Sequence, residues 1–543
     1  MPKILSDRIV YDHEDWLAGL VPQANNSLAL NVGEGAAYMR NVNPYRALGA
    51  IIPGFAPAAI TNEDNLQGLA VSGDSDFSGS TPYAYLISQA SNSALIQRLN
   101  LSSDTISGGA TAFPHNVTHT KAADHASFSS KDLVIFSITS GVSSTTSTMA
   151  MYSFSDDVDG DVGAYDISSG LEVFYDNFLS TQPEGGLVLT TDPHPMIIGG
   201  DGVLYIGNGN TLIALDGTTG GSGTASTKLT FPKGTVIRSF TKMAKYLIIY
   251  TSRSNIVSAA SYRGNSIAYF WDYVAGKFNF DYDLNDNLVT AGFNLGGVPG
   301  CFTYGRAGDG GALTTKIKMF NGSRFESEYE YRKNPPGHGS VDIYDNLLVF
   351  AFGDGAQNYI GSFGSPWPGR IKRSFNFWGE PQGSSLDLTN TGICKNLGGL
   401  KLYVSGGAGM SSFSSAYGPN TSSGSFWYGI LASPSFPFKT RGRIKSIKIH
   451  YRNTFTAGRT ATVALQIDAA LSVTVTVASA IGTIASAEDT IVEYFKDTNG
   501  VPFPEFHSFA PRITWDTGTD NTDAPPIKKI EIFFEPIQFK QPV

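Results

Sequence analysis

The chain has 543 residues, of which only 16% are charged, so its surface must be covered mostly by neutral polar groups. Its 60 glycines and 27 prolines separate short apolar runs, a pattern typical of many turns, and this largely excludes long helices. The apolar fraction of 41% and the aromatic fraction of 12% exclude a disordered chain and predict two or three domains with a large core.

The net charge of -9 argues against a protein that grips nucleic acid through a basic face. The two cysteines, Cys301 and Cys394, provide no disulfide framework, which suits synthesis in a reducing cytoplasm. The longest apolar run, 48–60, is interrupted by Pro53, Gly54 and Pro57, and the first residues lack the pattern of a secretory signal. We therefore expect no membrane insertion.

The first region, 1–60, is rich in proline and glycine and lacks the strand pattern of the residues that follow. It nevertheless carries many large apolar side chains, namely Trp16, Leu17, Leu20, Tyr45, Ile51, Ile52 and Phe55. We expect an extended N-terminal arm, part of which supplies the strand that closes a ring of sheets. The alternative is a disordered tail, which these side chains disfavour.

The second region, 61–436, contains short β-branched and aromatic runs that recur along the chain. Their markers are Leu69, Leu133, Leu204, Leu247, Phe302, Leu348 and Leu402. The intervals run from 43 to 71 residues and bracket the length of a four-stranded blade, about 40–50 residues. The pattern predicts an all-β protein with a β-propeller of about seven blades, and the two wide first intervals leave room for loops or one more blade.

Within several of these units a second pattern follows, a strand, a turn with Asp or Asn and Gly, and another strand. It occurs at 213–217, 269–280 and 318–331 and is typical of the outer hairpin of a blade. In the strand 325–331, alternation places Phe325, Ser327, Tyr329 and Tyr331 on one face and Glu326, Glu328 and Glu330 on the other. We expect the first face to pack and the second to face water.

The third region, 437–543, has a different pattern of expected strands. Strands are expected at 444–452, 462–468, 472–478, 509–516 and 529–537. In the last of these, Ile530, Ile532 and Phe534 alternate with more polar neighbours, as in a half-buried antiparallel strand. These strands predict a C-terminal β-sandwich. Helix and strand patterns compete at 485–496.

Three groups of residues resemble metal ligands. Asp157, Asp159 and Asp161 in the run 156–161 have the spacing of the start of a calcium loop, but Val162 and Ser168 replace its glycine and glutamate. Asp281, Asp283 and Asp286 match less well. The histidines His115, His119 and His125 do not lie in a helical pattern. We therefore predict polar loops, with no metal site and no cofactor.

No local motif encodes catalysis, since the sequence has neither a GxSxG elbow nor a phosphate-binding GxxxxGK[ST] loop. Paired carboxylates from different blades remain an open route to glycoside hydrolysis. The three glutamates of 325–331 are better interpreted as a wet blade edge. The basic stretch 439–452 is either a docking strip for a negative neighbour or a charged strand face.

Several segments resemble propeller-containing virion proteins of tailed bacteriophages. They are 16–23, 42–57, 202–217 and 267–280, and the pattern of Asn43, Pro44, Arg46, Gly49, Pro53 and Gly54 is the most telling part. The resemblance implies a structural tail component such as a nozzle, hub or adaptor, arranged as a ring around the DNA channel.

We therefore predict a non-enzymatic structural protein of a tailed phage virion, made in the host cytoplasm. It would form a homo-oligomeric ring and contact other tail or head–tail connector proteins, with DNA only as passing cargo and a host-surface contact as a further expectation. No catalytic, cofactor-binding or metal residue is predicted. The alternative is a carbohydrate-binding or glycan-degrading β-propeller that acts at the host surface.

Overall fold

The structure is a computed structural model in which every element is a β-strand. The described residues are 9–13, 15–20, 34–40, 42–47, 50–53, 55–59, 83–90, 93–100, 103, 105–106, 111–113, 132–139, 146–155, 160–166, 171–174, 190, 192, 194–216, 224–253, 266–274, 276–306, 313–332, 334–338, 340–344, 346–353, 358–365, 373–379, 393–397, 401–406, 409–417, 425–429, 441–452, 460–467, 471–478, 489–515 and 526–537. They contain no helix, and so none that is long and apolar enough to cross a membrane.

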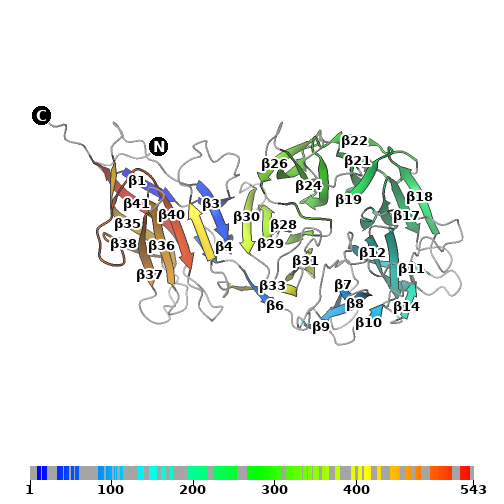
Figure 1. Ribbon diagram of the computed structural model, residues 1–543, viewed down its shortest axis with the longest axis horizontal. Helices are drawn as coiled ribbons and strands as arrows, with labels where there is room; N and C mark the ends of the chain where they lie inside the picture. The colour runs from blue at the N-terminus through cyan, green and yellow to red at the C-terminus, as the bar shows by residue number, and fades with distance from the viewer. Residues whose placement is uncertain are drawn as a thin grey trace. The chain divides into compact units, whose positions relative to one another are not determined.

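Four-stranded sheets recur along the chain (Figure 1). The first three comprise β7 (Tyr83–Ala90), β8 (Ser93–Asn100), β9 (Thr105–Ile106) and β10 (Thr111–Phe113); β11 (Asp132–Thr139), β12 (Thr146–Ser155), β13 (Gly160–Asp166) and β14 (Leu171–Phe174); and β15 (Met196–Ile198), β16 (Leu204–Asn208), β17 (Thr211–Asp216) and β18 (Thr224–Thr230).

The other four continue the series. They comprise β19 (Thr235–Met243), β20 (Tyr246–Arg253), β21 (Ile267–Trp271) and β22 (Phe280–Asp283); β23 (Leu288–Leu295), β24 (Val298–Arg306), β25 (Leu313–Phe320) and β26 (Phe325–Tyr331); β27 (Val341–Tyr344), β28 (Leu347–Gly353), β29 (Asn358–Gly364) and β30 (Ser374–Gly379); and β31 (Ile393–Leu397), β32 (Lys401–Gly406), β33 (Gly409–Tyr417) and β6 (Phe55–Ala59). The expected four-stranded antiparallel repeat is thus present.

The chain forms two compact units. Unit 1 comprises Met1–Pro57, Gly361–Glu380 and Phe413–Val543, and unit 2 comprises Ala58–Ile360 and Pro381–Ser412. This division differs from the expected regions 1–60, 61–436 and 437–543. The reason is that early strands hydrogen-bond to late ones: β1 (Ile9–His13), for example, pairs antiparallel with β41 (Ile527–Pro536).

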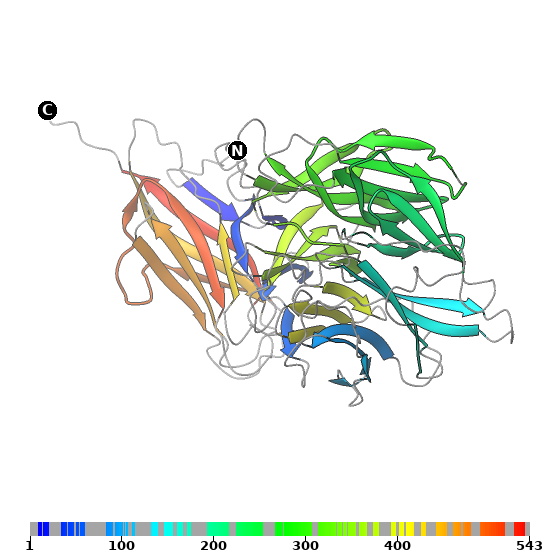
Figure 2. The same cartoon turned by 45° about the vertical axis from the view of Figure 1, so that its right-hand side comes forward.

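In unit 2 the first strands of successive sheets contact one another, β11 with β15, β15 with β19, β19 with β23, β23 with β27 and β27 with β31. Figure 2 shows the same sheets from a second angle. One close approach depends on glycine: a Cβ on Gly292 of β23 would collide with the ring of Tyr250 and the hydroxyl of Thr241. The first strands from β11 to β31 therefore lie next to one another in chain order.

The sheet β19–β22 shows how both faces are buried. Leu247, Ile249 and Trp271 join a cluster with residues of β15–β18, whereas Ile248 and Tyr250 join one with residues of β23–β26. All five side chains are fully buried. The continuous apolar run in β20 is therefore the sequence signature of a strand packed on two faces.

The alternation expected in β26 is wrong in its second half. The register with β25 shifts between Ile317 and Lys318, so that Glu328 is an extra residue and the strand turns over at that point. Phe325 consequently packs against Tyr250 of the preceding sheet. Tyr331 packs instead against Phe350 of the following sheet, with ring centroids 6.5 Å apart. The strand thus supplies aromatic side chains to both neighbours.

Unit 1 contains two larger sheets. One has the order β38 (Asp489–Tyr494), β35 (Gly442–Arg452), β41, β5 (Ala50–Pro53) and β4 (Val42–Ala47), with β1 on β41 and β39 (Glu505–Phe506) on β35; the other has the order β2 (Asp15–Leu20), β3 (Glu34–Arg40), β34 (Ser425–Gly429), β40 (Phe509–Trp515), β36 (Thr460–Ile467) and β37 (Leu471–Ala478). The strands expected in the C-terminal region are all present.

Aromatic packing and a hydrogen bond join these sheets. Phe534 of β41 lies 6.2 Å from Phe509 of β40, measured between ring centroids. The indole Nε1 of Trp16 in β2 donates a hydrogen bond of 2.7 Å to the carbonyl of Lys528 in β41. Residues 9–20 are therefore built into the sheets of unit 1, which corrects the expectation of an extended arm for this stretch.

The outer face of β35 carries the basic stretch predicted from the sequence. Its basic side chains face acids on neighbouring strands. Arg443 pairs with Glu505, Lys445 with Glu535, Lys448 with Glu493 and His450 with Glu531. These are exposed or half-exposed pairs, each worth at most about 1 kcal/mol. The interpretation as a charged strand face is confirmed for these residues.

The ambiguous segment 485–496 contains a strand. Residues Asp489–Tyr494 form β38, which pairs with β35 in the register Ile449 to Val492. The backbone hydrogen bonds that β35 offers on this side favour the strand over the competing helical pattern. Ile491 is 58% exposed and Phe495, just beyond the strand, is 65% exposed.

We expect Trp16→Phe to lower the free energy of unfolding of unit 1 by about 2 kcal/mol, because it removes a buried hydrogen bond and part of a buried ring. Urea unfolding followed by circular dichroism measures this change. Phe495→Ala, at an exposed site, is the matched control and is expected to change stability by less than about 0.5 kcal/mol. Equal stability of the Trp16 variant and the wild type would contradict this account of the two sheets.

Candidate functional site

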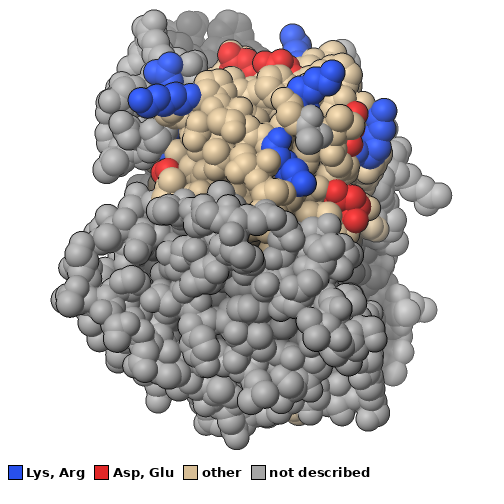
Figure 3. All heavy atoms as spheres, turned by 90° about the vertical axis from the view of Figure 1, so that its right-hand side faces the viewer, with Lys and Arg blue, Asp and Glu red and all other residues tan. Residues whose placement is uncertain are grey.

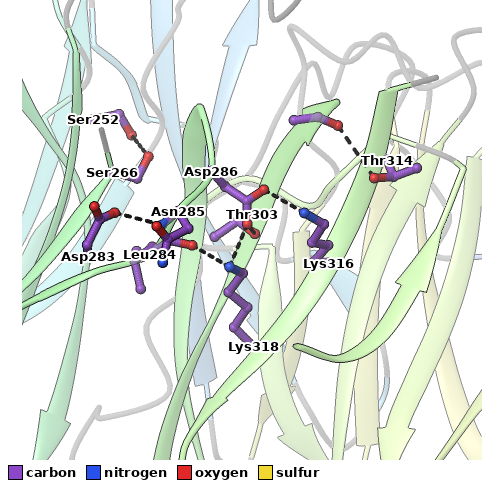
Figure 4. Close-up of polar contacts among 11 residues, drawn as sticks. Ser252, Ser266, Asp283, Leu284, Asn285, Asp286, Thr303, Thr314, Lys316 and Lys318 are labelled. Carbon is purple, nitrogen blue, oxygen red and sulfur yellow. Dashed lines mark hydrogen bonds and ion pairs between the residues drawn. The ribbon is translucent and has the colours of Figure 1, made fainter. Parts of the chain in front are cut away.

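A buried charged cluster in the described part of unit 2 surrounds Asp286, in the turn between β22 and β23 (Figure 4). Its carboxylate lies 2.8 Å from Nζ of Lys316 and 2.7 Å from Nζ of Lys318, both on β25. The hydroxyl of Thr303 on β24 donates a third hydrogen bond of 2.8 Å. Lys318 also donates to the carbonyl oxygen of Leu284.

This cluster ties two sheets together rather than presenting a reactive group. The backbone of Asp286 accepts a hydrogen bond from Ser266, next to β21, and the hydroxyl of Ser266 lies 3.3 Å from that of Ser252 on β20. The side chain of Asp286 is only 2% exposed. The neighbouring thiol of Cys301 is fully buried, and burial raises its pKa, so it remains protonated and unreactive.

Ser239 and His338 form a second polar contact between sheets. Oγ of Ser239 lies 2.7 Å from Nδ1 of His338 and accepts a hydrogen bond of 2.7 Å from the backbone N–H of Gly292. A nucleophilic serine needs a nearby base but also access to substrate. Ser239 is fully buried, so the pair holds β19, β23 and the segment before β27 together.

An exposed surface that hydrogen bonds hold in place lies at the hairpin between β21 and β22. The carboxylate of Asp272 accepts a hydrogen bond of 2.9 Å from the side-chain amide of Asn279, and the oxygen of that amide accepts one of 2.9 Å from the backbone N–H of Asp272. Trp271 donates from Nε1 to the carbonyl of Val274, and Gly276 donates to the carbonyl of Lys228 on β18. These contacts fix the hairpin from inside and from the neighbouring sheet.

Aromatic side chains stand on this fixed hairpin. Phe278 is 39% exposed and Phe280 is 50% exposed. Phe278 packs edge-on against Tyr269, with centroids 4.6 Å apart, and Phe280 packs edge-on against Tyr246 at 6.1 Å. The rings are therefore oriented by their neighbours while remaining accessible to solvent.

Polar groups border these rings. The ammonium of Lys245 lies 5.0 Å from the ring centroid of Tyr246. The hydrogen bond from Asn279 lowers the pKa of Asp272, and the charge of Lys245 acts in the same direction, so this carboxylate is ionised at neutral pH. We call Lys245, Tyr246, Asp272, Asn279 and Phe280 the hairpin surface; Phe278 packs against Tyr269 on the other face of the sheet. Figure 3 shows one face of the molecule, on which the described charged residues lie in separate groups rather than in one continuous patch.

The three groups of residues that resemble metal ligands differ in how much of each the structure describes. His115, His119 and His125 and the residues Asp156, Asp157 and Asp159 lie outside the described residues. Asp161 belongs to β13, and its side chain is not described. Of the third group, Asp286 is paired with two lysines, whereas Asp283 accepts a hydrogen bond from the backbone of Asn285. Within the described part of the chain, no group of three or more His, Cys, Asp or Glu side chains has the arrangement of a metal site.

The remaining candidates behave as structural groups. Glu326 forms an exposed ion pair with Arg324, and Glu328 is exposed on the same strand. The hairpin surface was not predicted from the sequence, because Phe280 alternates with polar residues as a buried side chain does. Phe280 is distinguished by its position on β22, the last strand of a four-stranded sheet.

Comparison with known proteins finds no matching family model and no matching curated protein. An exo-beta-1,3-galactanase from Phanerochaete chrysosporium is 12% identical, with 88% of this chain and 99% of that chain covered and a TM-score of 0.30. Drosophila Semaphorin 1a is 9% identical over 67% of this chain and 88% of that chain, with a TM-score of 0.39. The Dos1 propeller is 12% identical over 67% and 95%, with a TM-score of 0.35.

One expectation changes with these comparisons. The sequence predicted a chain that is not an enzyme, yet the chains that align with most of its length include the galactanase and a protein described as a glycoside hydrolase. The prediction that this chain is not an enzyme is therefore wrong as it stands. With TM-scores below 0.5, these likenesses assign no activity in its place.

We expect Asp286→Asn to destabilise unit 2 by about 3–5 kcal/mol, because it leaves the buried ammonium of Lys318 without its counter-charge. Chemical unfolding monitored by tyrosine and tryptophan fluorescence measures the loss. Glu326→Gln removes an acid from an exposed ion pair of the same unit and is the control. We expect it to cause no measurable loss of stability. Equal effects of the two substitutions would show that the buried cluster does not stabilise the unit.

His194 predicts a pH dependence of stability. Burial lowers its pKa from 6.5, and this effect outweighs the hydrogen bonds to the carbonyls of Gly207 and Thr190 and the charge of Asp192. As pH falls through 6.5, the unfolded chain takes up a proton before the folded chain does, so the free energy of unfolding decreases below that pH. We expect His194→Gln to be less sensitive to pH than the wild type in urea unfolding at pH values from about 7.5 down to about 5.5.

His507→Gln removes an exposed histidine and is the control for this experiment. We expect it to retain the pH dependence of the wild type. If His194→Gln retains the full pH dependence as well, the burial of His194 does not control acid sensitivity.

Proposed function

We propose that this chain is a carbohydrate-binding protein of β-propeller type and that it binds glycans through the hairpin surface. The observation that supports this proposal is the half-exposed ring of Phe280, packed on Tyr246, held on a hairpin by hydrogen bonds and bordered by polar groups. Exposed apolar rings on a fixed element are costly unless a ligand or partner covers them.

The chemistry of the hairpin surface suits a sugar. A pyranose ring has an apolar face of C–H groups that can stack on an aromatic ring, and hydroxyl groups at its edge that need hydrogen-bond partners. Phe280, with Tyr246 beside it, offers the first kind of contact. The carboxylate of Asp272 and the ammonium of Lys245 offer the second, as acceptor and donor respectively.

The same proposal includes the arrangement of the sheets. We infer that the four-stranded sheets close into a ring of about seven blades, and that the two larger sheets of unit 1 form a β-sandwich. The contacts between successive first strands support the ring, and the packing of Phe509 against Phe534 supports the sandwich.

The experiment is a glycan array followed by calorimetry of the glycans that bind. We expect Phe280→Ala to weaken binding by about tenfold or more, because stacking on one aromatic ring contributes about 1–1.5 kcal/mol beyond the area it buries. Phe495→Ala, which removes an exposed phenylalanine of unit 1, is the matched control and should bind like the wild type. Failure of the full chain to bind any glycan, or equal binding by Phe280→Ala, would contradict the proposal.

A second candidate is the structural component of a phage tail suggested by the sequence. The observation that favours it is the exposed apolar group at one edge of unit 1, formed by Ile491, Phe495 and Val501, all more than half exposed. Such a group suits contact between proteins. Assembly of the purified chain into rings that Phe495→Ala disrupts and Phe280→Ala does not would favour this candidate over the first.

A further inference from the structure

Arg238, on the first strand of the sheet β19–β22, is a half-buried cation that is incompletely paired. Its Nε is buried and has no hydrogen-bond partner among the described residues. The guanidinium makes one long hydrogen bond there, from Nη2 to the carbonyl of Arg253 at 3.4 Å. A guanidinium has five N–H donors, and leaving them unpaired away from water is costly.

A bulge in β19 determines the position of Arg238. In the pairing of β19 with β20, Ile237 faces Thr251 and Ser239 faces Tyr250, so Arg238 is an extra residue. The strand β23 has a bulge at the equivalent place, where Val289 faces Thr303 and Ala291 faces Phe302. Its extra residue is Thr290, whose Oγ1 is likewise buried with no partner in the described part of the chain.

The two bulges lie close together because β19 and β23 touch. The backbone N–H of Gly292, two residues after Thr290, donates to the hydroxyl of Ser239, the residue after Arg238. Ser340, just before β27, adds a third buried hydroxyl without a partner among the described residues. Arg238, Thr290 and Ser340 thus lie on adjoining segments of unit 2, and each has one buried polar atom without a partner among the described residues.

The charges around Arg238 indicate what would complete the site. Asp192 is close enough for its charge to raise the pKa of Arg238, against the lowering caused by burial, but these two side chains form no ion pair. A guanidinium pairs best with a planar oxyanion. With Asp192 nearby, a ligand that carries one negative charge is favoured over one that carries two.

We propose that Arg238 and Thr290 bind the carboxylate of a small acidic ligand where β19 and β23 meet. The guanidinium would donate two hydrogen bonds to the carboxylate, and the threonine hydroxyl would donate a third. This site is separate from the hairpin surface, so either proposal can fail while the other holds.

The test compares D-glucuronate with D-glucose, which differ by the carboxylate, in calorimetric titrations of the full chain. We expect glucuronate to bind and glucose to bind at least about tenfold more weakly. Arg238→Gln should weaken glucuronate binding by about tenfold or more, and Thr290→Val, which keeps the shape of the side chain, by a few-fold. Arg324→Gln removes an exposed arginine of the same unit and should leave binding unchanged.

Circular dichroism and thermal melting establish that each variant is folded, and Thr290→Val supplies the test if Arg238→Gln does not fold. The proposal is overturned if glucuronate does not bind the wild type or binds the folded variants equally well. It is also overturned if Arg324→Gln weakens binding as much as the substitutions at the bulges, or if inorganic phosphate binds more tightly than glucuronate.

Discussion

The structure of unit 2 depends on burying both faces of each four-stranded sheet. Such a sheet is too small to be stable alone, and its neighbours supply the apolar surface that it lacks. In β20, Leu247 and Ile249 pack toward one neighbour, whereas Ile248 and Tyr250 pack toward the other. Because the sheet β19–β22 packs on both neighbours in this way, the loss of packing in it weakens the adjoining sheets.

This constraint also decides where polar groups can lie. A carboxylate between two sheets must be paired, and Asp286 is held by two ammonium groups and a hydroxyl. Ser239 meets the same requirement with His338 and Gly292. Both groups connect one sheet to the next, so the polar contacts between sheets supplement the apolar packing rather than interrupt it.

The sequence predicts the strands of this protein better than their partners. A continuous apolar run such as Leu247–Tyr250 and an alternating one such as Ile530–Phe534 identify a strand and its buried faces directly. The bulge at Glu328 is not visible in the sequence, because alternation continues through it and only the register with β25 reveals it. The pairing of β1 with β41 is likewise unpredictable from local pattern, since it joins the two ends of the chain.

The candidate site shows the same limit. The alternation of Phe278, Phe280 and Tyr282 with Asn279, Asp281 and Asp283 predicts a buried aromatic face. The burial of that face depends on whether another strand or sheet covers it, and this is a property of the fold. Phe280 in β22, the last strand of its sheet, remains half exposed, and Phe278, just before that strand, is more than one third exposed.

The contrast between Asp286 and Arg238 bears on function. Asp286 is buried just before the first strand β23, whereas Arg238 is half-buried at the bulge within the first strand β19. Asp286 has as many partners as its carboxylate needs, as a structural group should. Arg238 has one long hydrogen bond, although the same fold provides carbonyls, hydroxyls and an acid close by. The Nε of Arg238 is buried without a partner among the described residues, and the carboxylate proposed above would supply the acceptor that it lacks.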